Sequence, residues 1–164
     1  MKKLLKNFFA KIVARDATPH ERALAVSFGL FLSFSPLLGV QTPLLFGGSW
    51  LFGLNAAVVF AIVYLVNNPW TMIPIVVLDY FVGYWLVEKF MGIDLTPYNP
   101  SFMGWLNNKI GPYIIKYLGV THLCLWYYII GGLIVATIIS VLSYPLVKMM
   151  LISYEHHHED HHSK

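Results

Sequence analysis

No charged side chain occurs between Arg22 and Asp79, and this uncharged stretch constrains the fold more than any other feature of the sequence. A second uncharged run extends from Tyr117 to Val147. A membrane-spanning helix needs about 20 apolar residues, so the first run has room for between two and three crossings and the second for one. Hydrophobic residues make up 57% of the 164-residue chain, and a soluble protein this small could not bury so much apolar surface. The sequence therefore predicts an all-α, polytopic helical membrane protein.

The first 16 residues are predicted to form an amphipathic helix that lies in the membrane interface. Apolar side chains recur at helical spacing between Leu4 and Val13, and basic or amide side chains lie between them. A soluble helix packed on a partner would show the same pattern, so that alternative stays open. Basic residues are concentrated before the first apolar segment, and the positive-inside rule places this end of the chain in the cytoplasm. Because the membrane explains this cluster, no nucleic-acid partner is expected.

The first membrane helix is predicted to break inside the bilayer. Thr18, Pro19 and Glu21 have the spacing of a helix start, with threonine as N-cap, proline at the first helical position and glutamate completing a capping box. The apolar stretch that follows, residues 23–34, would be about 18 Å long as a helix, which reaches roughly the middle of the hydrocarbon core. It ends at Ser35-Pro36, where proline removes a backbone donor. A broken or re-entrant helix is therefore expected, with the freed backbone groups satisfied by protein or water.

A second proline-marked break is predicted at Asn67-Asn68-Pro69. Between the two breaks, residues 43–66 form either one full crossing or two half-helices that meet near Asn55. A further helix is expected over residues 70–87, with a kink at Pro74. Paired interruptions in hydrophobic segments are a sequence pointer to the substrate site of a transporter. The two breaks are therefore expected to approach each other in space, and two independent packing kinks are the alternative.

The remainder of the chain is predicted to contain an interfacial segment, one more span and a tail. Turn signals and interfacial aromatic residues indicate a surface loop with a short helix. The tail is rich in histidine without a fixed ligand spacing, so disorder with adventitious metal affinity is favoured over a metal site. The predicted segments are the interfacial helix (1–16), the membrane domain with two breaks (17–88), the interfacial loop (89–121), the C-terminal transmembrane helix (122–150) and the disordered tail (151–164).

Small residues recur at every fourth position in two of the expected spans. One row is Ala25, Gly29 and Ser33, and the other is Gly132, Ala136 and Ser140. Such rows allow membrane helices to approach closely. They predict a compact bundle or a homo-oligomer.

Several motifs between Glu21 and Gly83 occur together in a known family. They are an alanine-rich entry helix, the turn Pro36-x-x-Gly39-x-Gln41-Thr42, Asn55 after a leucine-rich run, and Asn68-Pro69-x-Thr71 followed by Pro74. In this combination, residues 21–83 resemble the bacterial membrane family named domain of unknown function 2062, and no matching motif is identified beyond Val87. The resemblance implies a small multi-pass protein of the bacterial cytoplasmic (inner) membrane, joined in some other architectures to a glycosyltransferase. It implies no established activity.

Polar residues at and near the breaks form the predicted substrate-binding site. The breaks offer amides and hydroxyls beside helix N-termini, where free backbone donors attract anions. Arg22 can hold a phosphate as a planar fork, or anchor its helix at headgroup level. Asp79 is a lone ionisable residue in an apolar helix, which makes it a functional candidate, with Arg22 or Asn55 as possible partners and hydration near the interface as the alternative. The predicted site comprises Arg22, Gln41, Thr42, Asn55, Asn67, Asn68, Thr71 and Asp79.

These residues favour a carrier or scramblase-like protein that handles a lipid or a lipid-linked anionic substrate. Membrane lipids are the expected partners. The sequence contains no nucleophile–base arrangement, zinc motif or phosphate-binding loop, so neither an enzyme nor a cofactor or metal is expected. The alternative is a non-catalytic adaptor or stabilising subunit of a larger complex, for example a glycosyltransferase-associated one, with the small-residue rows as partner faces.

Overall fold

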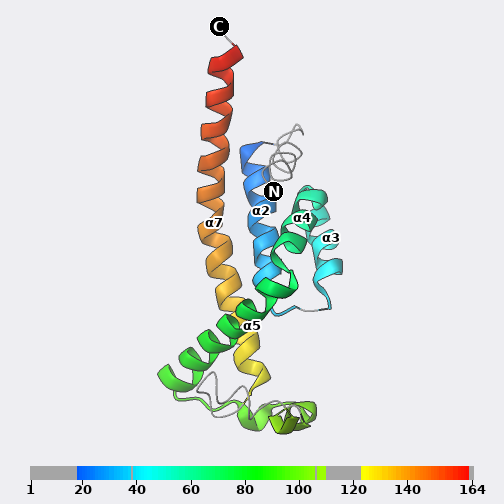
Figure 1. Cartoon of the computed structure of the whole chain (residues 1–164), viewed down its shortest axis with the longest axis vertical. Coiled ribbons are helices and arrows are strands. Elements are labelled where there is room, and N and C mark those ends of the chain that lie inside the picture. The colour runs from blue at the N-terminus through cyan, green and yellow to red at the C-terminus, as the bar shows by residue number, and fades with distance from the viewer. Residues whose placement is uncertain (1–17, 38, 106, 110–122, 163–164) are drawn as a thin grey trace. The chain divides into compact units, whose positions relative to one another are not determined.

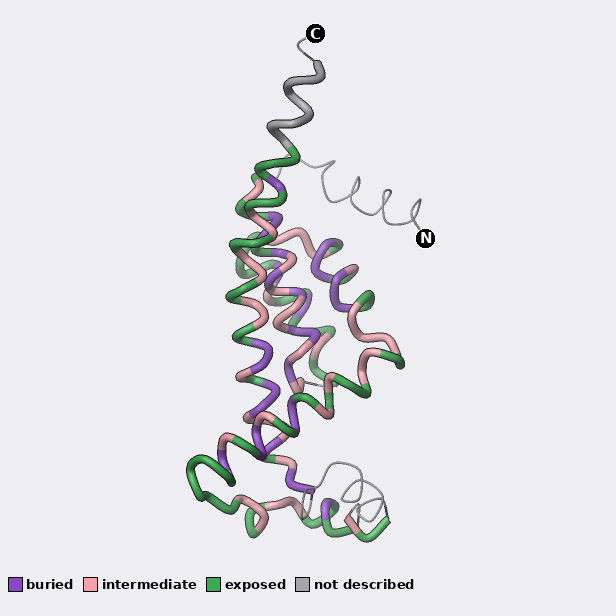
Figure 2. Tube along the Cα trace, turned by 60° about the vertical axis from the view of Figure 1, so that its left-hand side comes forward, coloured by how far each residue is buried: buried purple, intermediate pink, exposed green. Residues whose placement is uncertain are grey.

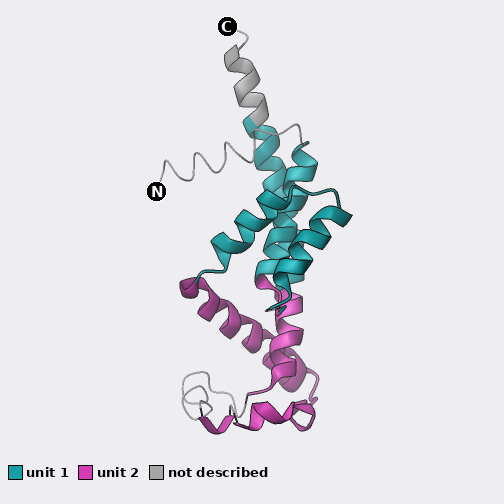
Figure 3. Cartoon of the chain, turned by 90° about the vertical axis from the view of Figure 1, so that its right-hand side faces the viewer, with its two compact units in different colours: residues 1–33, 37–68, 136–164 teal, residues 34–36, 69–135 magenta. Residues whose placement is uncertain are grey.

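The computed structural model describes residues 18–37, 39–105, 107–109 and 123–162, and every element in these ranges is a helix (Figure 1). The prediction of an all-α fold is confirmed for this part of the chain. The predicted interfacial helix, residues 1–16, lies outside the described residues. The chain divides into two compact units (Figure 3). Unit 1 contains residues 1–33, 37–68 and 136–164, and unit 2 contains residues 34–36 and 69–135.

Two helical segments of the described chain are long and apolar enough to cross a membrane. They are Pro69–Phe90 and Leu125–Tyr154, while Ala56–Val66 is apolar but shorter. Large apolar side chains of both segments are exposed, for example Trp70, which is 89% exposed, and Met150, which is 73% exposed. Figure 2 shows exposed positions of the described chain in green. Length and composition of these helices, together with their exposed apolar faces, indicate association with a membrane.

Helix α2 (Pro19–Phe34) begins as the sequence predicts. The Thr18 backbone N–H donates to Glu21 Oε2 at 2.8 Å, and the Glu21 backbone N–H donates to Thr18 Oγ1 at 3.3 Å. This reciprocal pair is a capping box, which satisfies two backbone donors at the helix start. The helix ends at Phe34, directly before Ser35-Pro36, so the predicted first break is confirmed.

Helices α3 (Gln41–Leu51) and α4 (Ala56–Val66) form a hairpin in unit 1 (Figure 1). The stretch between the breaks is thus two half-helices, and α3 begins two residues before the proline that was expected to open it. The turn between them has Gly53 at φ +63°, a left-handed conformation that glycine adopts without steric cost. Asn55 is the N-cap of α4, and its side-chain oxygen accepts from the Ala57 backbone N–H at 3.1 Å.

This cap leads to a first testable expectation. Replacing Asn55 with alanine removes the acceptor for an N-terminal amide of α4, and we expect it to lower the free energy of unfolding by about 1 kcal/mol. The matched variant Asn55→Asp retains a capping oxygen and should remain close to the wild type. Thermal unfolding in detergent measures both variants. An alanine variant as stable as the aspartate variant would show that the cap contributes nothing.

The small-residue row of α2 packs inside unit 1. A Cβ added to Gly29 would lie 2.8 Å from Ile62 Cβ of α4, so α2 and α4 approach each other at this glycine. Ser140 belongs to α7 (Leu125–His162), and its hydroxyl donates to the Ser27 carbonyl of α2 at 3.0 Å. The core of the unit lies between α2, α3 and α4. It contains the buried residues Ala25, Leu32, Leu45, Val58, Val59 and Val63.

In unit 2, helix α5 (Pro69–Gly83) continues into a π-helical segment, η1 (Tyr84–Phe90), and crosses the first turns of α7. The crossing is a backbone contact. A Cβ added to Gly83 would overlap the Tyr127 carbonyl oxygen, and one added to Gly131 would overlap the Asp79 carbonyl oxygen. Glycine at both positions is therefore what allows α5 and α7 to pack this closely.

The chain before α7 is held by two asparagine side chains. The Leu123 carbonyl oxygen accepts from Asn99 Nδ2 at 3.0 Å and from Asn107 Nδ2 at 3.1 Å. In return, Asn107 Oδ1 accepts from the Leu123 N–H and Asn99 Oδ1 accepts from the Leu125 N–H. These bonds fix the start of α7 against the predicted interfacial loop. In this loop a 3-10 helix (η2, Thr96–Tyr98) follows the Asp94 turn, and residues 101–105 and 107–109 are helical.

The end of the chain differs from the expectation. Residues 151–164 were predicted to be a disordered tail, whereas α7 continues through His162. The helix is therefore much longer than the predicted span of residues 122–150. Histidine and acidic residues are only moderately poor helix formers, so a helix already nucleated in the apolar segment can continue through them.

Candidate functional site

Gln41 of the first break and Asn67 of the second, both in unit 1, are joined by a chain of side-chain amides. Gln41 Nε2 donates to the Leu32 carbonyl oxygen at 2.9 Å, and Asn67 Nδ2 donates to Gln41 Oε1 at 3.2 Å. These bonds join the last turn of α2, the first residue of α3 and the residue that ends α4. We call Gln41, Asn67 and the Leu32 carbonyl the amide junction. The expectation that the breaks approach each other is confirmed.

The amide junction lies where backbone groups would otherwise lack partners. The last carbonyls of α2 and α4 have no intrahelical donor, because each helix ends there. Gln41 donates to a carbonyl in the last turn of α2, and Asn68 Nδ2 donates to the Leu65 carbonyl at 3.2 Å near the end of α4. In a hydrocarbon environment such groups have to be satisfied by the protein. The junction thus gives polar side chains a stable position next to apolar helices.

The far end of the α3–α4 hairpin is strongly apolar. Trp50 is 85% exposed, Leu51 71% and Phe52 63%, and all three lie at or next to the turn. With 11 residues each, α3 and α4 are about 16 Å long, roughly half the thickness of a hydrocarbon core. The hairpin therefore has a polar base, at the amide junction, and an apolar tip.

Other predicted site residues of unit 1 lie in different surroundings. Thr42 follows Gln41 and is exposed, and Asn68 follows Asn67 and is half-buried. Arg22 lies in the first turn of α2 and is only 8% exposed, so its side chain is enclosed by protein. Asn55 is at the opposite end of α4 from the amide junction, where it caps the helix. The structure thus brings Gln41, Asn67 and their sequence neighbours together, and separates Asn55 from them.

The two predicted site residues of unit 2 both lie on α5. Thr71 is half-buried in the first turn, whereas Asp79 is only 1% exposed and its Oδ1 has no hydrogen-bond partner among the described residues. The side chain of Asp79 is thus enclosed by protein in the described part of the chain. Of the two suggested partners, Asn55 uses its side-chain oxygen to cap α4. The suggested pairing with Arg22 joins residues of different units and stays a prediction.

A polar seam between α2 and α7 in unit 1 was not identified from the sequence. Ser143 Oγ donates to Ser27 Oγ at 3.1 Å, and His20 Nδ1 lies 2.6 Å from the Tyr144 hydroxyl. Serines spaced along an apolar helix are the signal that would have indicated such a seam, because hydroxyls stabilise the packing of membrane helices. Its role is to hold α2 against α7.

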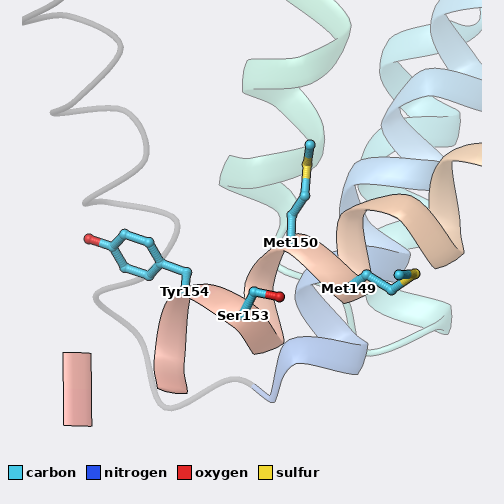
Figure 4. Close-up of a pocket in the computed structure, with 4 residues that line it drawn as sticks. All are labelled: Met149, Met150, Ser153 and Tyr154. Carbon is cyan, nitrogen blue, oxygen red and sulfur yellow. The ribbon is translucent and has the colours of Figure 1, made fainter. Parts of the chain in front are cut away.

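The surface concavity near the end of α7 is a separate feature. It has a volume of about 510 Å³ and is lined by Met149, Met150, Ser153 and Tyr154, which all project from this one helix (Figure 4). None of the predicted site residues lines it. Among the described residues, no group of three or more histidine, cysteine or acidic side chains could hold a metal ion. The amide junction and Asp79 therefore remain the candidate functional groups.

Comparison with known proteins places the sequence in one family. A family model described as an uncharacterized protein conserved in bacteria (DUF2062) matches residues 2–160. The match extends well beyond both ends of residues 21–83, where the resemblance was identified, so the last helix is part of the family pattern. No curated protein and no solved structure matches the chain significantly.

Proposed function

Because the chain belongs to a family of uncharacterised bacterial proteins, domain of unknown function 2062, we propose its function from its own residues: a carrier or scramblase-like protein for a lipid or lipid-linked anionic substrate. The observation that carries this proposal is the amide junction. It gathers two side-chain amides at the ends of three helices whose outer surfaces are apolar. Polar side chains of this kind, next to helices that face lipid, would give a charged headgroup hydrogen-bonding partners while it crosses the apolar part of the bilayer.

In this proposal the protein is a multi-pass protein of the bacterial inner membrane, with its N-terminus in the cytoplasm. The α3–α4 hairpin enters the bilayer as a re-entrant element, because each of its helices is about 16 Å long and its tip is apolar. The amide junction then lies at the base of the hairpin, next to the last turn of α2. Arg22, Thr42, Asn68 and Thr71 are the further residues proposed to contact the substrate.

The burial of the small-residue rows bears on the alternative of an adaptor. In that alternative, a partner protein would bind to these rows of small residues. Gly29 packs on Ile62, and Ser140 donates to the Ser27 carbonyl, so members of both rows are occupied by other parts of unit 1. Internal packing accounts for the rows, which supports the lipid-handling proposal over the adaptor.

Lipid exchange in reconstituted vesicles tests the proposal. Vesicles that contain the full chain and a fluorescently labelled anionic phospholipid are treated with a membrane-impermeant quencher. We expect the inner-leaflet label to become accessible in vesicles with protein and to stay protected in vesicles without it. Labelled lipid that stays on its original leaflet in both would overturn the proposal. A foreign protein crosslinked stoichiometrically in native membranes, in addition to that result, would favour the adaptor.

Variants at the junction connect the activity to the proposed site. We expect Thr42→Val and Asn67→Leu to slow exchange by about tenfold, which corresponds to about 1.4 kcal/mol in the barrier. Thr42 is exposed and makes no contact in the amide junction, so its variant keeps the fold-supporting bonds. Trp50→Leu at the hairpin tip is the matched control and should exchange lipid at the wild-type rate. Equal lipid-exchange rates in all three variants would show that the activity does not depend on the amide junction.

A further inference from the structure

Asp79 combines deep burial with an unsatisfied carboxylate oxygen. Its side chain is 1% exposed, and Oδ1 has no hydrogen-bond partner among the described residues. An ionised carboxylate in an apolar helix costs several kcal/mol unless it is paired or hydrated. A neutral carboxylic acid avoids most of that cost. The burial of Asp79 is therefore compatible with a protonated side chain and disfavours a charged one.

The surroundings of Asp79 in unit 2 are closely packed. A Cβ added to Gly132 of α7 would lie 3.2 Å from Asp79 Oδ2 and 2.9 Å from Pro36 Cδ. Because Gly132 has no side chain, the carboxyl group of Asp79 and the ring of Pro36 can pack against α7 at this position. The Asp79 backbone contacts Gly131 in the same crossing. Any separation of α5 from α7 would change the environment of the carboxyl group.

Among the described residues of unit 2, the titratable side chains that α7 brings to the crossing with Asp79 are phenols. From α7, the titratable side chains within unit 2 are Tyr127 and Tyr128. Residues 34–36 contain no titratable side chain. On its own helix, Asp79 is followed by Tyr80, and the next charged residue is Glu88, about 13 Å further along the axis.

From this geometry we propose that Asp79 is a proton-binding site and that the movement of the substrate is coupled to it. The Asp79 carboxyl keeps its O–H bond while α5 and α7 are packed as in this structure. When the crossing opens to water, that bond breaks, the proton passes to a water molecule and the carboxylate is hydrated. The coupling rests on the proposed carrier function, whereas the proton site does not.

A proton fits this position better than a metal cation. A cation such as sodium or calcium requires several oxygen ligands at short distance. Among the described residues no cluster of three or more acidic, histidine or cysteine side chains exists. A proton needs only one carboxylate oxygen, and Asp79 offers that.

Infrared spectroscopy of the full chain in lipid vesicles tests the proton site directly. At neutral pH, we expect a carbonyl-stretch band of a protonated carboxylic acid in the wild type. The band should be lost in Asp79→Asn and should persist in Glu88→Gln, the matched acid on the same helical segment. It should also be unchanged when sodium replaces potassium. Absence of an Asp79-dependent band, or its loss on adding sodium, would overturn the proton site.

The coupling is tested in the vesicle assay with a pH difference across the membrane. We expect the gradient to change the exchange rate severalfold for the wild type and for Glu88→Gln, and to have no effect on Asp79→Asn. A lipid-exchange rate of the wild type that does not depend on the pH gradient would overturn the coupling. If the infrared band is present but no protein exchanges lipid, the carrier function fails and the proton site stands. If lipid exchanges without an Asp79 band, the proton site fails and the carrier function stands.

Discussion

Replacing Gly131 or Gly83 with alanine is expected to destabilise the protein more than any other single change considered for the described residues. The Cβ added at Gly131 would overlap the Asp79 carbonyl oxygen, and the Cβ added at Gly83 would overlap the Tyr127 carbonyl oxygen. Both obstacles are backbone atoms of a packed helix, so neither can move aside as a flexible side chain does. Overpacking in a core typically costs ~1–3 kcal/mol, and we expect at least the upper end of that range here.

Thermal unfolding in detergent, followed by size-exclusion chromatography of the heated sample, measures this effect. Gly47→Ala in the middle of α3 is the matched control, because an added Cβ there meets no atom within 4 Å. Alanine is a better helix former than glycine by about 1 kcal/mol, so the control should be as stable as the wild type or more stable. If Gly131→Ala and Gly47→Ala unfold at the same temperature, α5 and α7 do not cross by backbone contact.

The second large effect is expected at the amide junction. Gln41→Leu removes both the donor to the Leu32 carbonyl and the acceptor for Asn67 Nδ2. A fully buried amide that loses its partner costs ~1–3 kcal/mol. Gln41 and Asn67 are half-buried, so we expect each of the variants Gln41→Leu and Asn67→Leu to lose stability near the lower end of that range. The double variant should lose less than the sum, since each change alone leaves the other side chain with an unused polar group.

A double-mutant cycle from unfolding curves gives this coupling, which we expect to be about 0.5–1.5 kcal/mol. Thr42→Val is the control, because Thr42 is exposed and adjacent to Gln41 in the sequence but outside the junction. Additive losses for Gln41 and Asn67 would mean that the two breaks are not joined by their side chains.

Local features of the fold could be predicted from the sequence because their causes are local. The capping box of Thr18 and Glu21 requires only a spacing of three residues, and the structure has both of its hydrogen bonds. The break after Phe34 follows from the proline at position 36. One of the two alternatives had two half-helices meeting near Asn55, and the structure has Asn55 as the N-cap of α4.

Features that depend on the rotation and contact of distant helices could not be predicted in the same way. The row Gly132, Ala136 and Ser140 indicates a close-packing face, but the residue in backbone contact with α5 is the neighbouring Gly131. Which glycine faces the partner depends on the angle of the crossing. The Asn99 and Asn107 bonds to residue 123 likewise join segments far apart in the chain. The breaks themselves were placed correctly, while the Gln41–Asn67 bond needed the structure.

The α3–α4 hairpin has a consequence for how such a protein would be assembled. Both of its ends lie at the amide junction, and the hairpin contains no charged residue, because none occurs between Arg22 and Asp79. Inserting it would therefore move only an apolar turn into the lipid and would translocate neither terminus of the segment. It contributes no positive charge to the balance that orients a membrane protein. The orientation would then be decided by the residues before α2 and after α5 alone, and a hairpin of altered length would leave that orientation unchanged.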